Sequence, residues 1–260
     1  MGDVVLVEAT GGTRIVMINR PQARNALTRE VLSLARRAFD EASSDPATRC
    51  VVLCGAEGHF CSGADLRQNL MDDPSMMDHL EVYMDAFHGL VKSVVRCDKP
   101  TIAMMDGGAV GFGADLAFAC DLRVASTRAY AQEKFVKIGL MPDGGGTFWL
   151  PRLVGTARAM QMILLADKVE AEELHRLGVV VKLAPPDGLR DATLAIARQI
   201  EAGPPLALSA AKRSLYASWG SFEDALQRER TEQLKLLRSA DSLEGVAAWM
   251  MKREPIFRGQ

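Results

Sequence analysis

The sequence lacks an excess of charge of either sign: 31 lysines and arginines stand against 33 aspartates and glutamates, for a net charge of -2. A nearly neutral chain has no electrostatic reason to bind nucleic acid or an anionic membrane, although a local basic cluster still suits a small polyanion. It also lacks a run of eighteen apolar residues and an N-terminal signal pattern. These absences predict a cytoplasmic protein with neither a membrane nor a nucleic-acid partner.

Cysteine is scarce, and its spacing carries no pattern. The five cysteines include no Cys-x-x-Cys pair and no Cys/His spacing typical of a metal site. An odd number of scattered cysteines fits reduced, mostly buried thiols better than a disulfide framework. We therefore predict no metal centre.

Two nucleotide-binding patterns are missing as well. Residues 111–116 (GFGADL) lack the third glycine of a dinucleotide fingerprint, and no glycine is followed by Lys-Ser or Lys-Thr as in a P-loop. In the segment MPDGGGT, residues 141–147, Pro142 stands where a strand would have to lead into a phosphate cradle. The glycine-rich segments need another explanation.

What is present favours one large α/β core. About 48% of the residues are apolar, and the length suits a single domain with an appendage. Gly11-Gly12 separates two β-rich runs and predicts a hairpin, while apolar residues at helical spacing after Thr28 predict a helix. A further helical pattern ends near Arg96, and an apolar helix follows Gly107-Gly108. The predicted strands are residues 4–8, 13–19, 50–54, 101–105 and 122–126.

The last third of the chain changes character. From Asp187 to Arg253 the pattern is amphipathic and helical, with breaks at residues 203–205 and at Gly220. We predict a core with the ligand site in residues 1–195 and a helical oligomerisation region in residues 196–260. Subunit contact and ordinary packing both fit its apolar rows, which include Leu226, Leu234, Leu237, Val246, Trp249 and Met250.

Two glycine segments follow neighbouring predicted strands. Gly63 lies in GHFCSGADL, residues 58–66, which by itself is also consistent with a tight turn that uses Asp65 as a helix N-cap. Gly111 lies at the start of an apolar helix, where free N–H groups and the helix dipole favour negative charge. Together the two segments can direct N–H groups at one carbonyl oxygen, which is what an oxyanion hole requires.

Five motifs in order extend this pattern over nearly the whole chain: NRPQARNAL (residues 19–27), FCSGADL (60–66), GGAVGFGADLAFACDLRVA (107–125), IGLMPDGGGTFWLPRLVG (138–155) and KREPIFRG (252–259). With them the sequence resembles the crotonase, or enoyl-CoA hydratase/isomerase, superfamily, and within it the isomerase-like members. The resemblance implies a ClpP/crotonase-like α/β spiral of ββα units with a C-terminal helical region that builds homotrimers, often paired into hexamers. It also implies an acyl-CoA thioester substrate and no separate cofactor, because coenzyme A is part of the substrate.

By position, the resemblance implies an oxyanion hole made by the backbone N–H groups of Ala64, after Gly63, and Phe112, after Gly111. These donors stabilise the thioester enolate that the family's reactions share. The coenzyme A moiety is then expected along the rim of the same site, with Arg24 as phosphate partner. The residues implied for its binding are Arg24, Ala26, Asp65 and Leu66, with Phe257 and Arg258 from the tail of the same or a neighbouring subunit.

The acid and base positions depart from the hydratases of the family, which use two glutamates. Here the first position is Asp115 and the second is Phe135, which cannot hold or deprotonate water. Asp143 follows in a Pro-Asp-Gly turn where some double-bond isomerases carry their acid. Dienoyl-CoA isomerases have both aspartates but keep a glutamate at the position of Phe135. The pattern favours an isomerase with Asp143 as principal base and Asp115 as its partner or proton donor, in a pocket that Phe135 makes drier.

Several alternatives stay open. Asp115 also suits an ion pair with Arg123, Asp143 also suits a helix N-cap, and Glu133 stands close enough in sequence to Phe135 to enter the site. Three isomerase types fit the pattern: 3-enoyl/2-enoyl, dienoyl and phenylacetate-pathway ring isomerases. The other candidate functions are a hydratase, in which Asp115 and either Glu133 or Asp143 hold water, and a non-catalytic subunit that binds coenzyme A.

Overall fold

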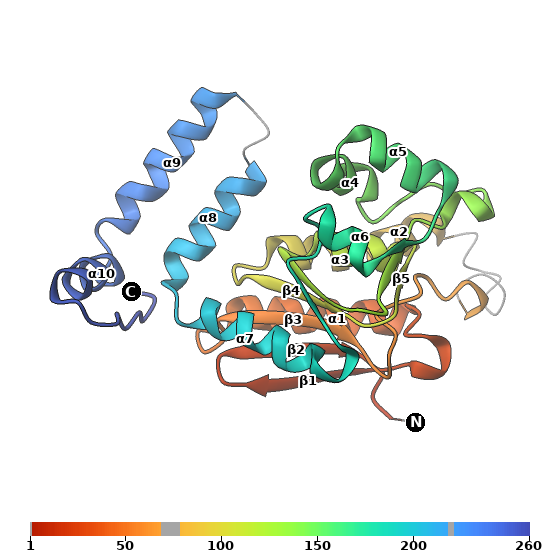
Figure 1. Ribbon diagram of the computed structural model, residues 1–260, viewed down its shortest axis with the longest axis horizontal. Coiled ribbons are helices and arrows are strands. Elements are labelled where there is room, and N and C mark those ends of the chain that lie inside the picture. Colours follow the sequence, from red (N-terminus) through yellow and green to blue (C-terminus); the bar gives the residue numbers. More distant parts are fainter. Residues whose placement is uncertain (1, 69–78, 218–220) are drawn as a thin grey trace.

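The main sheet of the protein has six strands. The computed structural model (Figure 1) describes residues 2–68, 79–217 and 221–260. The first two strands form the predicted antiparallel hairpin, and the remaining strands are parallel to the second. In spatial order the strands are β1 (Val5–Thr10), β2 (Thr13–Ile18), β3 (Cys50–Gly55), β4 (Thr101–Met105), β6 (Leu122–Ser126) and β9 (Lys182–Ala184).

A second, three-stranded sheet is made of β5 (Gly108–Val110), β7 (Tyr130–Gln132) and β8 (Val169–Glu170). The chain passes from β4 directly into β5 and then into α3 (Phe112–Ala119), and it passes from β6 into β7 in the same way. Each pass therefore contributes one strand to each sheet. This repetition confirms the predicted α/β spiral of ββα units.

The central strands of the main sheet are buried on both faces, because their side chains alternate between the faces and helices cover each one, whereas β1 at the edge is mostly exposed. In β3, Val51 and Leu53 pack with α1 (Arg29–Ser44) and α2 (Leu80–Arg96), whereas Val52 packs on the other face with α7 (Leu189–Glu201). The strands consequently read as continuous apolar runs, as expected for a parallel sheet between helical layers. All five cysteines are free and buried, as the sequence predicted.

The helices after the spiral lie in two groups. The shorter ones follow the second sheet: α4 (Gly146–Val154) packs on α3, α5 (Thr156–Leu165) packs on α4, and α6 (Ala171–Arg176) packs against β7 and β8. The C-terminal helices α8 (Pro205–Ala217), α9 (Phe222–Leu236) and α10 (Ala240–Met251) extend away from the sheets on the left of Figure 1. The predicted division after residue 195 falls inside α7, and Ala197 in the second half of this helix is fully buried against the sheet.

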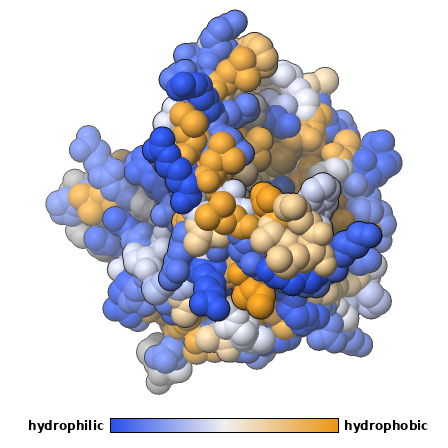
Figure 2. Space-filling model, turned by 90° about the vertical axis from the view of Figure 1, so that its left-hand side faces the viewer, coloured by the Kyte–Doolittle hydropathy of each residue, from blue (hydrophilic) through white to orange (hydrophobic). Residues whose placement is uncertain are grey.

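The apolar rows of α9 and α10 remain exposed within one chain. Trp249 is 82% exposed and Met250 72%, and Leu226 and Val246 are also open to solvent. Figure 2 shows apolar residues gathered on the side of the molecule where these helices lie. Packing within the chain does not account for these side chains, so the subunit contact stays a prediction with structural support. None of the described helices is long and apolar enough to cross a membrane.

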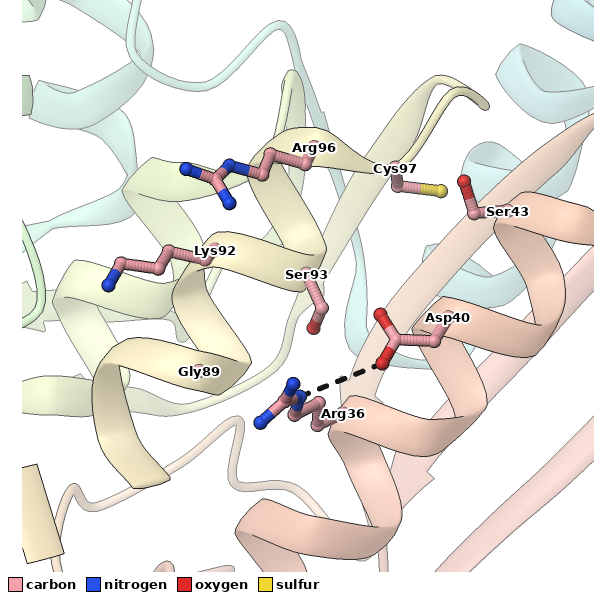
Figure 3. A pocket seen from close by; sticks show the side chains of 8 residues that line it. All are labelled: Arg36, Asp40, Ser43, Gly89, Lys92, Ser93, Arg96 and Cys97. Atoms are coloured by element: carbon pink, nitrogen blue, oxygen red, sulfur yellow. Dashed lines mark ion pairs between the residues drawn. The ribbon is translucent and has the colours of Figure 1, made fainter. Parts of the chain in front are cut away.

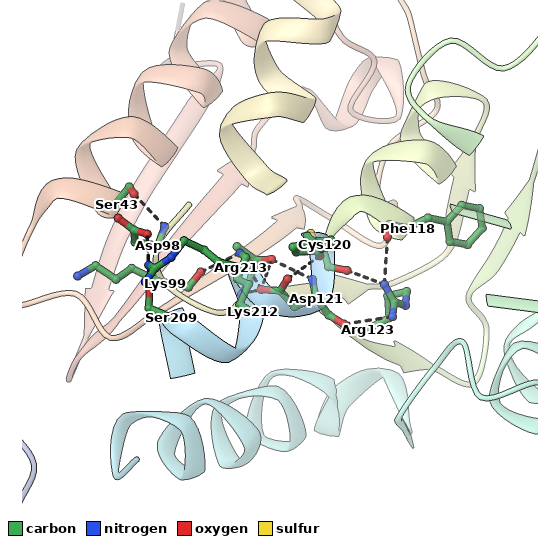
Figure 4. A network of polar contacts seen from close by, with 12 residues as sticks. Ser43, Asp98, Lys99, Phe118, Cys120, Asp121, Arg123, Ser209, Lys212 and Arg213 are labelled. Carbon is green, nitrogen blue, oxygen red and sulfur yellow. Dashed lines mark hydrogen bonds and ion pairs between the residues drawn. The ribbon is translucent and has the colours of Figure 1, made fainter. Parts of the chain in front are cut away.

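A buried polar network joins α8 to the spiral (Figure 4). Lys212 Nζ lies 2.8 Å from Asp121 Oδ2, and only 7% of the lysine side chain is exposed. The same ammonium donates to the carbonyl oxygen of Lys99, and the hydroxyl of Tyr216 donates to Asp121 Oδ1. Asp121 also accepts from the backbone N–H of Thr101 at the start of β4. The network ties the C-terminal helices to the central strands.

Replacing Lys212 by methionine should lower the free energy of unfolding by about 3 kcal/mol, because it leaves the Asp121 carboxylate partly buried without its cation. Urea-induced unfolding at pH 7 measures the change. Lys235→Met is the matched control, since its lysine is 67% exposed in a surface pair with Glu232 and should cost less than about 1 kcal/mol. Equal effects of the two substitutions would contradict the role given to Lys212.

Candidate active site

The loop after β3 runs alongside β5. The N–H of Cys61 donates to the carbonyl of Gly108 at 3.0 Å, and the N–H of Val110 donates to the carbonyl of Cys61 at 2.9 Å. Cys61 and Ala109 thus pair as in a parallel sheet, and a Cβ on Gly63, the residue before Ala64, would lie 3.4 Å from the backbone nitrogen of Phe112. The two predicted oxyanion residues, which are far apart in sequence, therefore lie next to each other.

Two glycines allow this close approach. Gly63 has a φ of 89°, and a Cβ on it would lie 2.8 Å from the carbonyl oxygen of Val110. Gly111, with a φ of 54°, precedes α3 and has no side-chain cap. Within the described part of the chain, the N–H groups of Ala64 and Phe112 make no hydrogen bond. Two free, adjacent donors at a helix start are what the predicted oxyanion hole requires.

Asp115 lies in the first turn of α3 and is fully buried. Its Oδ2 accepts from the N–H of Gly144 at 2.7 Å, and its Oδ1 has no hydrogen-bond partner among the described residues. Burial raises the pKa of Asp115 to about 7. The alternative ion pair with Arg123 is wrong, because that guanidinium donates to backbone carbonyls, among them those of Cys120 and Val179.

Glu133 follows β7 and enters the same site. It is 1% exposed, and neither of its carboxyl oxygens has a hydrogen-bond partner among the described residues. A Cβ placed on Gly146 would be 2.2 Å from Asp115 Oδ1 and 3.0 Å from Glu133 Oε1, so both carboxyls face the same point. Burial, followed by the charge of Asp115, raises the pKa of Glu133 to about 10.

Asp143 is half-buried in the turn before α4. Its Oδ1 lacks a hydrogen-bond partner within the described residues, and burial raises its pKa while the nearby His88 lowers it. The N-cap interpretation is wrong, since α4 begins at Gly146 with Gly145 as its N-cap and no side-chain cap. His88 Nε2 donates to the carbonyl oxygen of Asp143 at 3.0 Å, which fixes the turn against α2.

An apolar wall completes the site. Phe135 is 8% exposed, and its ring lies 3.8 Å from where Gly111 would carry a Cβ. The ring of Phe112 meets that of Phe87 edge-on at 4.6 Å, and Phe87 in turn contacts Tyr83. Free N–H donors, three carboxyls and aromatic rings together suit proton transfer on an apolar group whose carbonyl oxygen takes up negative charge.

Residues 8–260 match the family model described as enoyl-CoA hydratase/isomerase. The chain belongs to the enoyl-CoA hydratase/isomerase family. It is 36% identical to a protein of Rhodobacter capsulatus named as a probable enoyl-CoA hydratase, over 97% of both chains. It is 32% identical to the 1,2-epoxyphenylacetyl-CoA isomerase of Escherichia coli over the full length of both.

Solved structures agree with this assignment. The enoyl-CoA hydratase of Bacillus anthracis has a TM-score of 0.94 at 28% identity and covers 99% of this chain and 100% of its own. That of Polaromonas has a TM-score of 0.92 at 31% identity, covering 97% and 99%. The fold is therefore the crotonase fold that the motifs implied.

In this hydratase/isomerase fold, four of the six residues implied for coenzyme A lie near Ala64: Arg24, Ala26, Asp65 and Leu66. The side chain of Arg24 is exposed, and its carbonyl accepts from the N–H of Ser62. Leu66 is 40% exposed, whereas Ala26 is buried. Arg24 and Leu66 are therefore the accessible members of the set.

Asp65 has structural partners of its own. It pairs with Arg20 at 2.8 Å, and its Oδ1 accepts from the N–H of Gln68, the contact expected of a helix N-cap. Arg20 also donates to the carbonyl of Ala26 at 2.6 Å. Sequence reasoning missed Arg20, although it stands inside the first motif, because only the folded loop brings it to Asp65.

A single chain does not bring the tail residues to the site. The carbonyl oxygen of Phe257 accepts from Arg49, and the N–H of Arg258 donates to Asp241. Arg49 immediately precedes β3, whereas the loop with Ala64 follows β3, so the tail lies at the opposite end of that strand. Contact of Phe257 and Arg258 with coenzyme A stays a prediction that needs a neighbouring subunit.

At least two cavities of the described structure lie outside this site, and one of them is between α1 and α2. It has a volume of about 180 Å³, and its walls include Arg36, Lys92 and Arg96 (Figure 3). Arg36 pairs loosely with Asp40 at 3.6 Å. None of the predicted site residues lines this cavity, so we do not assign the acyl group to it.

Proposed function

We propose that the protein is an acyl-CoA double-bond isomerase of the 3-enoyl/2-enoyl, dienoyl or ring type. The observation that supports this choice is the Asp143 carboxyl, whose Oδ1 is buried and without a partner in the described structure. Phe135 stands where family hydratases carry their second glutamate, and its ring adjoins Gly111. An unengaged carboxylate beside an apolar wall suits removal of a carbon-bound proton better than the holding of water.

In the proposed reaction, the Asp143 carboxylate removes a proton from the carbon between the double bond and the thioester. The electron pair moves onto the thioester oxygen, and the N–H groups of Ala64 and Phe112 stabilise the resulting enolate. Return of the proton from Asp143 to the far end of the conjugated system completes the shift. No atom is gained or lost, so one carboxyl group suffices.

A hydratase is the second candidate. The relative from Rhodobacter capsulatus is named as a probable enoyl-CoA hydratase. In addition, the carboxyls of Asp115 and Glu133 face each other near Asp143 and form a pair. Hydration needs two carboxyls to hold one water over the double bond. The Asp115 and Glu133 oxygens instead face the start of α4, and the Gly144 N–H already occupies Asp115 Oδ2. This arrangement favours the isomerase.

A substrate panel tests the proposal directly. Purified protein is incubated with 3-enoyl-CoA, 2-enoyl-CoA, 3,5-dienoyl-CoA and ring-bearing acyl-CoA thioesters, and the products are identified by mass and chromatography. We expect products of unchanged mass with a displaced double bond. A gain of one water, giving 3-hydroxyacyl-CoA as main product, would support the hydratase. Binding without turnover of any substrate would support a non-catalytic subunit.

The pH dependence of kcat/KM should follow Asp143. A base acts only when it is ionised, and burial raises the pKa of this carboxyl above the ordinary value of 3.8. We therefore expect kcat/KM to fall as the pH is lowered, with the inflection above 3.8. Initial rates between pH 4 and 8, corrected for inactivation, measure it. An inflection at or below the ordinary value would contradict a buried aspartate as base.

We extend the proposal to the assembly and the coenzyme. The exposed apolar faces of α9 and α10 support a homotrimer, or a hexamer of two trimers. We place this assembly in the cytoplasm, as the sequence predicts. In such an assembly Arg24 and Leu66 contact coenzyme A from one chain, together with Ala26 and Asp65 in the loops behind them. Phe257 and Arg258 contact it from a neighbouring chain.

A further inference from the structure

Four buried carboxyl oxygens in the site lack a hydrogen-bond donor in the described structure, and three of them belong to two facing groups: Asp115 Oδ1 and both oxygens of Glu133. Both side chains are at most 1% exposed. Buried polar atoms are nearly always hydrogen-bonded, because the free energy lost when a bond to water is broken is offset only by a new hydrogen bond within the protein. Two ionised carboxylates cannot satisfy each other, since neither has a proton to donate.

We infer that Asp115 and Glu133 share one proton, and that protonated Glu133 is a positioning residue that holds the Asp115 carboxylate and, through it, the Asp143 turn. This inference rests on the proposed function, because it describes how the proposed base is held. A carboxylic acid hydrogen on Glu133 supplies the donor that Asp115 Oδ1 lacks. The two groups then carry one negative charge in place of two.

The charges around the pair require this arrangement. The groups that act electrostatically on Glu133 are the carboxyls of Asp115 and Asp143, and His88 acts on Asp143 from α2. No described lysine or arginine forms an ion pair with Asp115 or Glu133. Without a cation, a second buried negative charge beside the first is strongly unfavourable. Asp115 Oδ2 accepts from the N–H of Gly144, which stabilises a charge on the aspartate, whereas no described donor contacts either oxygen of Glu133; the proton therefore belongs on the glutamate.

The pair is connected directly to the catalytic turn. Asp115 Oδ2 accepts from the N–H of Gly144, the residue after Asp143. A Cβ on Gly144 would lie 2.6 Å from the Cβ of Asp115, and one on Gly146 would lie 2.2 Å from Asp115 Oδ1. These glycines therefore let the turn sit directly on the carboxyl pair. A displaced Asp115 displaces the Asp143 carboxyl with it.

The test compares Glu133→Gln and Glu133→Leu with the parent enzyme. Glutamine keeps an N–H donor toward Asp115 without a charge, whereas leucine removes the donor. We expect kcat of Glu133→Gln to stay within about threefold of the parent, and kcat of Glu133→Leu to fall roughly 10- to 100-fold with a smaller change in KM. Glu229→Gln, at an exposed position on α9, is the matched control and should change neither.

Infrared difference spectroscopy of the protein without substrate reads the proton itself. At pH 8 the parent minus Glu133→Gln spectrum should contain the carbonyl band of a protonated carboxylic acid, and the parent minus Glu229→Gln spectrum should not. Absence of the band would overturn the inference, because both groups would then be ionised. Glu133→Gln as inactive as Glu133→Leu would also overturn it, since the carboxyl would then act in the chemistry.

The spectroscopic test needs no turnover and therefore separates this inference from the proposed function. If the substrate panel reveals a hydratase, the band still decides whether the proton is shared. If the band is missing while the double bond still migrates, the inference of a shared proton is wrong and the proposed function stands. If Glu133→Leu does not fold, the infrared spectrum and activity of Glu133→Gln still decide.

Discussion

Asp143→Asn is expected to lower kcat for double-bond migration by about 100- to 10,000-fold, the range that general acid–base groups contribute. Asparagine has nearly the same shape but cannot take up the carbon-bound proton. The backbone contact between His88 Nε2 and the carbonyl of residue 143 does not involve the replaced group. We therefore expect KM to change little, because the coenzyme A rim is untouched.

The matched control is Asp187→Asn, at an exposed aspartate outside the site, which should leave kcat unchanged. Steady-state kinetics with the best substrate of the panel provide both numbers. Hydration of crotonyl-CoA at a rate that survives Asp143→Asn would contradict the isomerase proposal. Migration within tenfold of the parent would show that another group acts as base.

Gly63→Ala is expected to lower kcat by about 100- to 1,000-fold, as the loss of an oxyanion-hole donor does. The new Cβ would lie 2.8 Å from the carbonyl oxygen of Val110, which is backbone and cannot rotate away. The loop must therefore move off β5, and the N–H of Ala64 then separates from that of Phe112. The donors no longer converge on one oxygen.

Gly178→Ala separates this effect from simple backbone strain. Gly178 has a φ of 77°, comparable with the 89° of Gly63, but a Cβ on it would meet nothing within 4 Å. We expect it to cost about 1 kcal/mol in thermal or urea unfolding while kcat stays unchanged. If the two variants lose the same activity, the proposed oxyanion hole is wrong.

The sequence was sufficient where local rules and burial agree. The hairpin around Gly11-Gly12 and the buried strand at residues 50–54 were both confirmed, because an apolar run between turn signals has few alternatives. The sequence also located Gly63 and Gly111. Both adopt a positive φ, which glycine does at little cost, so glycine at these positions is a local signal.

The sequence was insufficient where partners come from distant segments. It left Glu133 as an alternative, since only the packing of α4 against α3 shows that this carboxyl faces Asp115. It gave no signal for His88, a histidine within an amphipathic helix pattern. It also left open an ion pair between Asp115 and Arg123. In the structure the Arg123 guanidinium instead donates to backbone carbonyls such as that of Cys120.

By itself, the sequence determined the family and the spiral of ββα units, and it located the segments of the two proposed oxyanion donors, because motifs and strand patterns are local properties of the chain. Only the tertiary structure decided which carboxyls meet. Asp115 lies in α3, Glu133 in the segment after β7 and Asp143 in the turn before α4, and their ionisation depends on mutual distance and burial. Neither quantity is encoded at any one position, since both arise when α4 closes over α3.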